Sequence, residues 1–259
     1  MSNQGSNFVV FRPRPAAAFR LFCFPHAGGA PIAFFPWMAH FSEDIECICL
    51  QYPGRAQRLR EKPSTCIQQL VSGITGELGE MSAKPFAFYG HSFGGIVAFE
   101  LARNLRLFGL PGPRHLYIGA ARPPQLESPF SSIHMLPDKD FIAAVESRYG
   151  GIPAAIAADS EAMEMFLPSL RGDFTAYETY RFQPADPLDI PITVFGGTED
   201  PAVQPECLEG WALHTHEAFG INILPGGHFF PATSIRELIR VLEVPVSQYQ
   251  SEKNSTFVH

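Results

Sequence analysis

The hexapeptide GHSFGG, residues 90–95, holds one serine between glycines, after one apolar run and before another. The preceding PFAFY has the composition of a buried strand, and the following GIVAFELARNL has a helical period. A chain that turns directly from strand to helix must bend sharply, and Gly90 and Gly94 permit the close backbone approach. The bend leaves the hydroxyl of Ser92 near a helix N-terminus, where unpaired N–H groups favour negative charge. We therefore expect Ser92 to be a nucleophile rather than part of a flexible turn.

A serine hydroxyl needs a neighbouring base to take its proton. The best candidate among the nine histidines is His228, because PGGHFF follows an apolar run near the C-terminus and offers a Gly-Gly loop. His26 and His91 are weaker candidates. His91 directly precedes Ser92, so its side chain should diverge from that of the serine. The order serine, acid, histidine along the chain also favours His228.

The imidazole of such a base needs a carboxylate that holds its tautomer and stabilises its positive form. Asp200, in VFGGTEDP, follows a buried-strand pattern, and strand ends are where a parallel sheet gathers its site. Glu199 is adjacent and remains a rival, although neighbouring side chains diverge. An earlier strand end, IGAARPP at 118–124, contains no carboxylate. We expect Asp200 to be the acid.

A carbonyl group attacked by Ser92 develops a negative oxygen, which needs hydrogen-bond donors. The backbone N–H of Phe93, directly after the nucleophile, can be one donor. The segment PHAGGA, residues 25–30, follows an early strand-like run, and its glycines let the backbone approach a ligand. We expect the N–H of Ala27 to be the second donor. Together these residues predict an acyl-transfer site, with no metal and no cofactor.

Short apolar runs alternate along the chain with segments of helical period, and several runs are continuously apolar, as in strands buried on both faces. The runs are FRLFCF (19–24), IECICLQY (45–52), PFAFYG (85–90), RHLYIGA (114–120), PITVFGG (191–197) and INILPGG (221–227). Candidate helices lie near 31–41, 65–81, 94–108, 203–214 and 234–242. This alternation predicts an α/β fold with a mostly parallel sheet covered by helices on both faces.

The alternation breaks between residues 123 and 187, where apolar residues recur at helical spacing. An insert of this length is too long for an ordinary connection, so we expect a helical cap over one edge of the sheet. Its apolar stripe could also simply pack on the main core. We expect a single domain over residues 1–244 with this insertion at about 123–187, and a disordered tail at 245–259.

The composition excludes several classes of protein. With 46% apolar and 17% charged residues in 259, the chain has the make-up of a folded globular protein. A net charge of −7 without a basic run argues against nucleic-acid binding, and no apolar run is long enough for a membrane span. The N-terminus lacks a signal-peptide pattern, and the five cysteines match no zinc or redox spacing. We expect reduced thiols and a cytoplasmic monomer.

Five motifs, FPHAGGA, LQYPGR, GHSFGG, FGGTEDP and GGHFF, occur in an order that resembles type II thioesterases of the α/β-hydrolase superfamily. The resemblance covers residues 19 to 243 approximately, and implies an α/β-hydrolase fold with a helical lid. It also implies hydrolysis of acyl groups from the phosphopantetheine arm of acyl or peptidyl carrier proteins, which clears stalled or misprimed chains in polyketide and nonribosomal peptide synthesis. The resemblance implies that Ser92, Asp200 and His228 form the catalytic triad. It also implies that the backbone N–H groups of Ala27 and Phe93 are the oxyanion donors.

The segment YPGRAQRLREK, residues 52–62, holds four basic residues against one glutamate. Carrier proteins are generally acidic and this chain is itself net negative, so favourable steering requires a local basic surface. Our hypothesis is that Arg55 and Arg58 help to dock the carrier or its phosphate. The alternative is an ordinary solvated basic loop.

Other functions share parts of this pattern. A small-molecule carboxylesterase or lipase-like hydrolase would carry the same triad, and only substrate preference would separate it. A macrocyclising thioesterase also uses these residues but normally ends a multidomain synthase. A non-catalytic ligand-binding relative would usually lack a triad member, and none is missing here.

Overall fold

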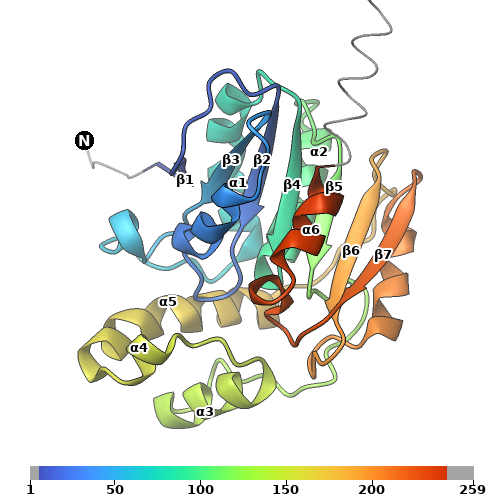
Figure 1. Ribbon diagram of the computed structural model, residues 1–259. Coiled ribbons are helices and arrows are strands. Elements are labelled where there is room, and N and C mark those ends of the chain that lie inside the picture. The colour runs from blue at the N-terminus through green and yellow to red at the C-terminus, as the bar shows by residue number, and fades with distance from the viewer. Residues whose placement is uncertain (1–5, 244–259) are drawn as a thin grey trace, which may run out of the picture.

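A seven-stranded sheet forms the centre of the computed structural model, which describes residues 6–243 (Figure 1). The strand order is β1-β3-β2-β4-β5-β6-β7; β1 pairs antiparallel with β3, and the other pairs are parallel. The strands are β1 (Phe8–Val9), β2 (Phe19–Phe24), β3 (Ile45–Leu50), β4 (Phe86–His91), β5 (Leu116–Gly119), β6 (Ile192–Gly197) and β7 (Phe219–Leu224). The predicted α/β fold with a mostly parallel sheet is confirmed.

Helices of two kinds connect the strands. The α-helices are α1 (Ile67–Met81), α2 (Phe93–Leu107), α3 (Asp138–Arg148), α4 (Ala154–Ala157), α5 (Ser160–Thr179) and α6 (Ile235–Leu242). The 3-10 helices are η1 (Pro31–Ala39), η2 (Ala56–Arg58), η3 (Pro205–His214) and η4 (Phe230–Ala232). The segments expected to be helical near 31–41 and 203–214 are thus 3-10 rather than α-helical. In η1, Pro36 lies inside the helix and cannot donate the backbone hydrogen bond that an α-helix requires.

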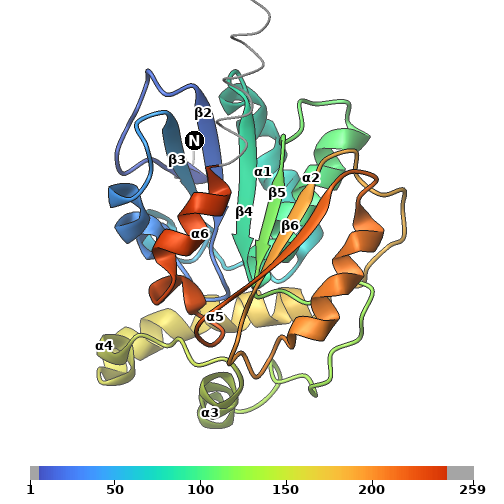
Figure 2. The ribbon, with the colours of Figure 1, turned by 45° about the vertical axis from the view of Figure 1, so that its right-hand side comes forward.

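Side chains of the strands alternate between two cores, one on each face of the sheet. Phe22 and Phe88 belong to the core that includes residues of α1 and α2. Cys23 and Tyr89, one position further along the same strands, belong to the core that includes residues of η1 and α6. Figure 2 shows α6 in front of the sheet and α1 and α2 behind it. Burial on both faces explains why the strands lack a polar alternation.

The helices α3, α4 and α5 lie together beyond one end of the sheet, below it in Figures 1 and 2. They come from the stretch 123–187, in which the alternation of strand and helix patterns breaks in the sequence. Their small core consists of Ile133, Phe141, Val145, Leu170 and Phe174. The hydrophobic stripe of α5 packs within this group of helices at Leu170 and Phe174, and on the main core at Ala176 and Tyr177.

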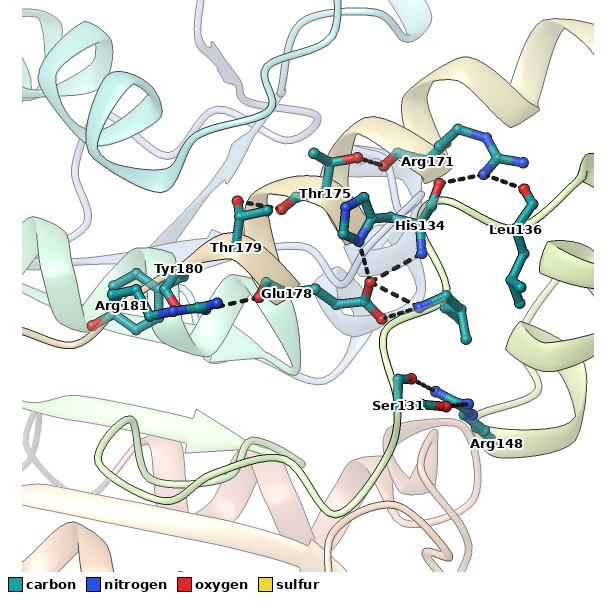
Figure 3. Close-up of polar contacts among 11 residues, drawn as sticks. Ser131, His134, Leu136, Arg148, Arg171, Thr175, Glu178, Thr179, Tyr180 and Arg181 are labelled. Atoms are coloured by element: carbon teal, nitrogen blue, oxygen red, sulfur yellow. Dashed lines mark hydrogen bonds and ion pairs between the residues drawn. The ribbon is translucent and has the colours of Figure 1, made fainter.

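The segment that precedes α3 is bound along α5 (Figure 3). The carboxylate of Glu178 accepts hydrogen bonds from the N–H groups of Ile133 and His134 and from Nδ1 of His134. The guanidinium group of Arg171 donates to the carbonyl oxygens of His134 and Leu136. These bonds join residues 133–136, which precede α3, to α5.

No helix within residues 6–243 is both long and apolar enough to cross a membrane. The expected tail, residues 245–259, lies outside the described residues.

Candidate active site

Ser92 stands at the sharp turn between β4 and α2, with φ at +54°. This conformation is unusual for a residue with a Cβ, and such strain is characteristic of a nucleophile turn. The turn is possible because the flanking residues are glycines. A Cβ on Gly90 would overlap the carbonyl of Gly94, and a Cβ on Gly94 would overlap the carbonyl of Phe24. The sequence pattern thus folds as expected and presents the hydroxyl at the end of the strand.

His228 follows β7 on a glycine loop, and its ring reaches the serine. The distance from Nε2 of His228 to Oγ of Ser92 is 2.9 Å. The ring is buried, with 4% of the residue exposed. An imidazole at hydrogen-bonding distance from a hydroxyl can accept its proton during attack.

Asp200 follows β6, and its carboxylate holds the other side of the same ring. Oδ2 of Asp200 lies 2.8 Å from Nδ1 of His228. Oδ1 accepts hydrogen bonds from the backbone N–H groups of Ala202 and Val203, which fixes the carboxylate in place. The rival Glu199 is exposed and Asp200 is buried, so the structure places Asp200 against the histidine.

The two expected oxyanion donors lie beside the serine, where Ala27 and Phe93 line the same cavity as Ser92. Phe93 is the first residue of α2, so its N–H belongs to the free N-terminal end of the helix. Within residues 6–243, no acceptor is recorded for the N–H of Ala27 or of Phe93. Two free N–H groups next to a nucleophile can bind a developing oxyanion.

The loop that carries Ala27 is held by a buried carboxylate that the sequence analysis did not identify. Asp173 of α5 accepts a 2.7 Å hydrogen bond from the N–H of Gly28. The same carboxylate binds both terminal nitrogens of Arg55, at 2.7 and 2.8 Å, and Arg55 also donates to the carbonyl of Gly29. Asp173 and Arg55 are 1% and 6% exposed. The ion pair therefore fixes the oxyanion loop against α5.

This arrangement corrects the expectation that Arg55 and Arg58 dock a carrier protein. Arg55 is buried, and its two terminal nitrogens bind Asp173 and the carbonyl of Gly29, so it presents no charge to a partner. Arg58 makes two bonds to the carboxylate of Glu61, and a third to the carbonyl of Gln51. These two arginines therefore belong to structural ion pairs, one with a carboxylate far along the chain and one with a carboxylate nearby.

Two further residues, His91 and Tyr89, hold His228 in place through its backbone carbonyl. Nε2 of His91 lies 2.9 Å from the carbonyl oxygen of His228, and Nδ1 of His91 lies 3.0 Å from the hydroxyl of Tyr89. Because a carbonyl only accepts, Nε2 of His91 must carry the proton, and Tyr89 donates to Nδ1. Burial, reinforced by His228 and His26, lowers the pKa of His91 well below its usual range and keeps it neutral. The divergence of His91 from Ser92 was expected, but its bond to His228 was not.

The cavity at Ser92 is small, with about 30 Å³ of free space. Apolar side chains of the α3–α5 group close it, including Val145, Phe166 and Phe174. Tyr149 also lines it, and the ring of Tyr149 lies 5.1 Å from that of His228. Among residues 6–243, no group of three or more metal-ligating side chains is placed to hold an ion.

The arrangement of the serine, histidine and aspartate can perform acyl transfer, and the comparisons with known proteins agree. The family described as "Thioesterase domain" matches residues 19–244. The gramicidin S biosynthesis protein GrsT of Aneurinibacillus migulanus is 38% identical over 235 residues, which cover 91% of each chain.

Solved structures are similar over most of their length. The RedJ thioesterase from the prodiginine pathway of Streptomyces coelicolor has a TM-score of 0.78 at 36% identity, covering 84% of this chain and 85% of that one. YbtT, a type II thioesterase from the yersiniabactin NRPS/PKS pathway, has a TM-score of 0.82 at 30% identity, with 92% and 97% covered.

Proposed function

The chain belongs to the thioesterase domain family, and from this membership we propose that Ser92, His228 and Asp200 are the residues that hydrolyse its thioester. The protein is a type II editing thioesterase of polyketide or nonribosomal peptide biosynthesis, with the α/β-hydrolase fold. The observation that supports the assignment of the three residues is their continuous hydrogen-bonded row, from Oγ of Ser92 through the ring of His228 to the carboxylate of Asp200.

In the first half of the proposed reaction, Oγ of Ser92 attacks the thioester carbonyl while Nε2 of His228 takes its proton. Asp200 holds Nδ1–H of the ring and stabilises the imidazolium. The N–H groups of Ala27 and Phe93 bind the oxyanion. The carbon–sulfur bond then breaks, the proton passes from His228 to the departing sulfur, and an acyl-serine remains. A thiolate is a good leaving group, so this step suits a thioester.

In the second half, water replaces the thiol. His228 takes one proton from the water, whose oxygen attacks the acyl-serine at the carbonyl carbon. The same two N–H groups bind the second oxyanion. When the bond to Oγ breaks, His228 returns the proton to Ser92 and a free carboxylic acid leaves.

The proposed partner is an acyl or peptidyl carrier protein, whose phosphopantetheine arm presents the thioester. Membership in this class implies action on carrier-bound intermediates of such pathways. We assign the helices α3, α4 and α5 as the lid of a single domain. Side chains of α3 and α5, and of the chain that follows α3, line the cavity at Ser92, which supports this role.

The test is to load one carrier protein with several acyl groups and to measure release of free acid. We expect Ser92→Ala to lower kcat/KM by at least about 10³-fold on every acyl group, because the members of a triad act together. Ser72→Ala, on the exposed side of α1, is the matched control and should keep normal turnover.

The same assay separates the remaining alternative, a small-molecule carboxylesterase. A carrier-dependent thioesterase should release acyl groups from the carrier faster than from matched oxygen esters. Faster cleavage of oxygen esters would assign the triad to an esterase instead. Full activity of Ser92→Ala on carrier-bound substrates would overturn the assignment of the nucleophile.

We propose that the protein works as a monomer in the cytoplasm. Free cysteines support a reducing compartment: the sulfur atoms of Cys23 and Cys47 lie 3.5 Å apart without a bond between them. The monomeric state is a prediction from the sequence, and light scattering of the purified protein checks it.

A further inference from the structure

Resting on the proposed function, we infer that a second cavity beside the active site binds the phosphate group of the phosphopantetheine arm. This cavity, the arginine pocket, has a free volume of about 430 Å³. Three arginines line it: Arg122 after β5, Arg148 at the end of α3 and Arg181 after α5. A thioester held at Ser92 has its phosphate at the far end of the pantetheine arm, so a phosphate site is expected next to the catalytic cavity and not within it.

The arginine pocket adjoins the site of the reaction. Tyr149 and Tyr177 line both the arginine pocket and the cavity that contains Ser92. Tyr149 also packs with its ring against His228 on the catalytic side. A ligand that extends from one cavity to the other therefore passes beside these two rings. The arm of the substrate has the extended shape that such a path requires.

The three guanidinium groups retain their charge for a ligand. Among residues 6–243, their recorded partners are backbone carbonyl groups, one serine hydroxyl and the ring of Phe130, which lies under Arg148, with no carboxylate. Arg122 donates to the carbonyl of Glu127, Arg148 to the carbonyl and hydroxyl of Ser131, and Arg181 to two carbonyls of α5 and its end. This differs from Arg55 and Arg58, whose carboxylate partners neutralise them.

Two carboxylates also line the pocket, and one of them is already occupied. Figure 3 shows the carboxylate of Glu178 bound by His134 and the neighbouring backbone N–H groups. The other carboxylate, that of Glu127, is on an exposed residue, where water screens its charge. Three cations against two carboxylates leave the residues that line the pocket with a net positive charge.

The arginines that line the pocket have donors of the kind that a phosphate needs. A guanidinium group offers parallel N–H donors to phosphate oxygens. Nε of Arg122, like Nε of Arg14 and of Arg55, is buried and has no recorded acceptor among the described residues, so the donors that can face a ligand are the terminal nitrogens.

The test compares thioesters that carry the same acyl group with and without the phosphate. The substrates are an acyl-pantetheine, an acyl-phosphopantetheine, an acyl coenzyme A and an acyl carrier protein. We expect Arg122→Gln, and more strongly the combination with Arg148→Gln and Arg181→Gln, to lower kcat/KM on the acyl-phosphopantetheine and the acyl carrier protein by about tenfold or more. Turnover of the acyl-pantetheine should change less than about twofold, which also shows that the variants fold.

Arg106→Gln is the matched control. Arg106 is an exposed arginine that also binds only backbone carbonyls, and it lies outside the arginine pocket, on α2. It should leave all four substrates unaffected. Equal losses with and without the phosphate, or no loss on the acyl-phosphopantetheine, would overturn the proposal. A loss confined to acyl coenzyme A would assign the pocket to that free cofactor and overturn the carrier-borne arm as its ligand.

Binding can be measured separately from hydrolysis. Calorimetry with Ser92→Ala and phosphopantetheine should show an affinity at least about tenfold above that for pantetheine, and addition of Arg122→Gln should remove the difference. Equal affinities would contradict the phosphate site even if the enzyme hydrolyses thioesters. Conversely, failure of the hydrolysis assay would leave this result unchanged.

Discussion

At the scale of single residues, the position of His228 is fixed through its backbone carbonyl as well as through its ring. The side chain of His228 is held by Asp200, and its carbonyl is held by His91, which Tyr89 orients in turn. Ser92 and His91 are adjacent, so the strand that carries the nucleophile also fixes the position of the base. The end of β4 therefore contributes, together with Asp200, to the distance between Oγ and Nε2.

This predicts a positioning role for His91. His91→Leu removes the donor to the carbonyl of His228 and should lower kcat by about tenfold, since a buried carbonyl without a partner costs about 1–3 kcal/mol. His91→Gln can still donate to that carbonyl and should restore most of kcat.

The measurement is kcat and KM for both variants on a phosphate-free thioester, together with the pH profile. A structural role alone would lower the unfolding temperature of both variants without separating their rates. Equal losses in His91→Leu and His91→Gln would contradict the positioning role.

The residues that could be singled out from the sequence are those with a motif around them. Ser92, Asp200 and His228 each follow a strand, and their order along the chain is informative. Asp173 and His91 could not be assigned in this way, because they act on backbone atoms of distant segments. Arg55 was misjudged for a related reason: a sequence shows a charge but not the buried carboxylate 118 residues away that pairs with it.

At the scale of elements, the turn from β4 into α2 depends on the absence of side chains at two positions. Gly94→Ala should abolish activity and lower the free energy of unfolding by at least about 2 kcal/mol, because its Cβ would overlap the backbone of Phe24. Gly76→Ala is a matched control in α1, where nothing lies near the added Cβ; it should stabilise the helix by about 0.5–1 kcal/mol. Urea titration of both variants checks this, and a normally active Gly94→Ala would contradict it.

The contact between α5 and the oxyanion loop leads to a second prediction. Asp173→Ala would leave the guanidinium group of Arg55 buried without a counter-charge and Gly28 without its acceptor. Loss of one partner of a buried pair costs about 3–5 kcal/mol, so the midpoint of urea denaturation should fall strongly. Asp189→Ala, at an exposed position, should leave the midpoint unchanged. A similar midpoint in both variants would show that the pair does not fix the loop.

The elements themselves were predictable where the pattern is long. The buried strands and α1, α2 and α6 follow from continuous apolar runs and helical periods. The strand β1 has only two residues, too few to show a period. In η1 the apolar pattern indicates a helix, but the proline within it changes the type of helix.

At the scale of the whole molecule, several buried histidines make stability depend on pH. Burial lowers the pKa of His26 to about 3 and those of His115 and His214 to about 4, and it lowers the pKa of His91 well below its usual range. An unfolded chain binds these protons near pH 6.5, whereas the folded chain does not. Stability should therefore fall as the pH drops from about 6.5 to about 4, by up to about 1.4 kcal/mol per pH unit for each histidine.

Denaturation curves at pH 7 and pH 5 measure this slope. His115→Gln should reduce the loss of stability between pH 7 and pH 5, because the variant lacks one of the histidines whose pKa is lowered by burial. The variant is suitable because His115 lies on β5's N-terminal side, bonded to Thr193 and away from the triad. An unchanged slope in the variant, or higher stability at pH 5 than at pH 7, would contradict the prediction.

The bonds made by α5 decide which part of the lid is able to swing. Its Asp173 is tethered to the loop of Gly28, and its Glu178 and Arg171 hold the chain at residues 133–136. Among the residues that the structure describes, the recorded hydrogen bonds of the stretch 149–159 run within itself or to the helices on either side. This stretch starts with Tyr149, Gly150 and Gly151. A hinge at these residues would widen the passage to Ser92, and the N–H groups of Ala27 and Phe93 would keep their positions.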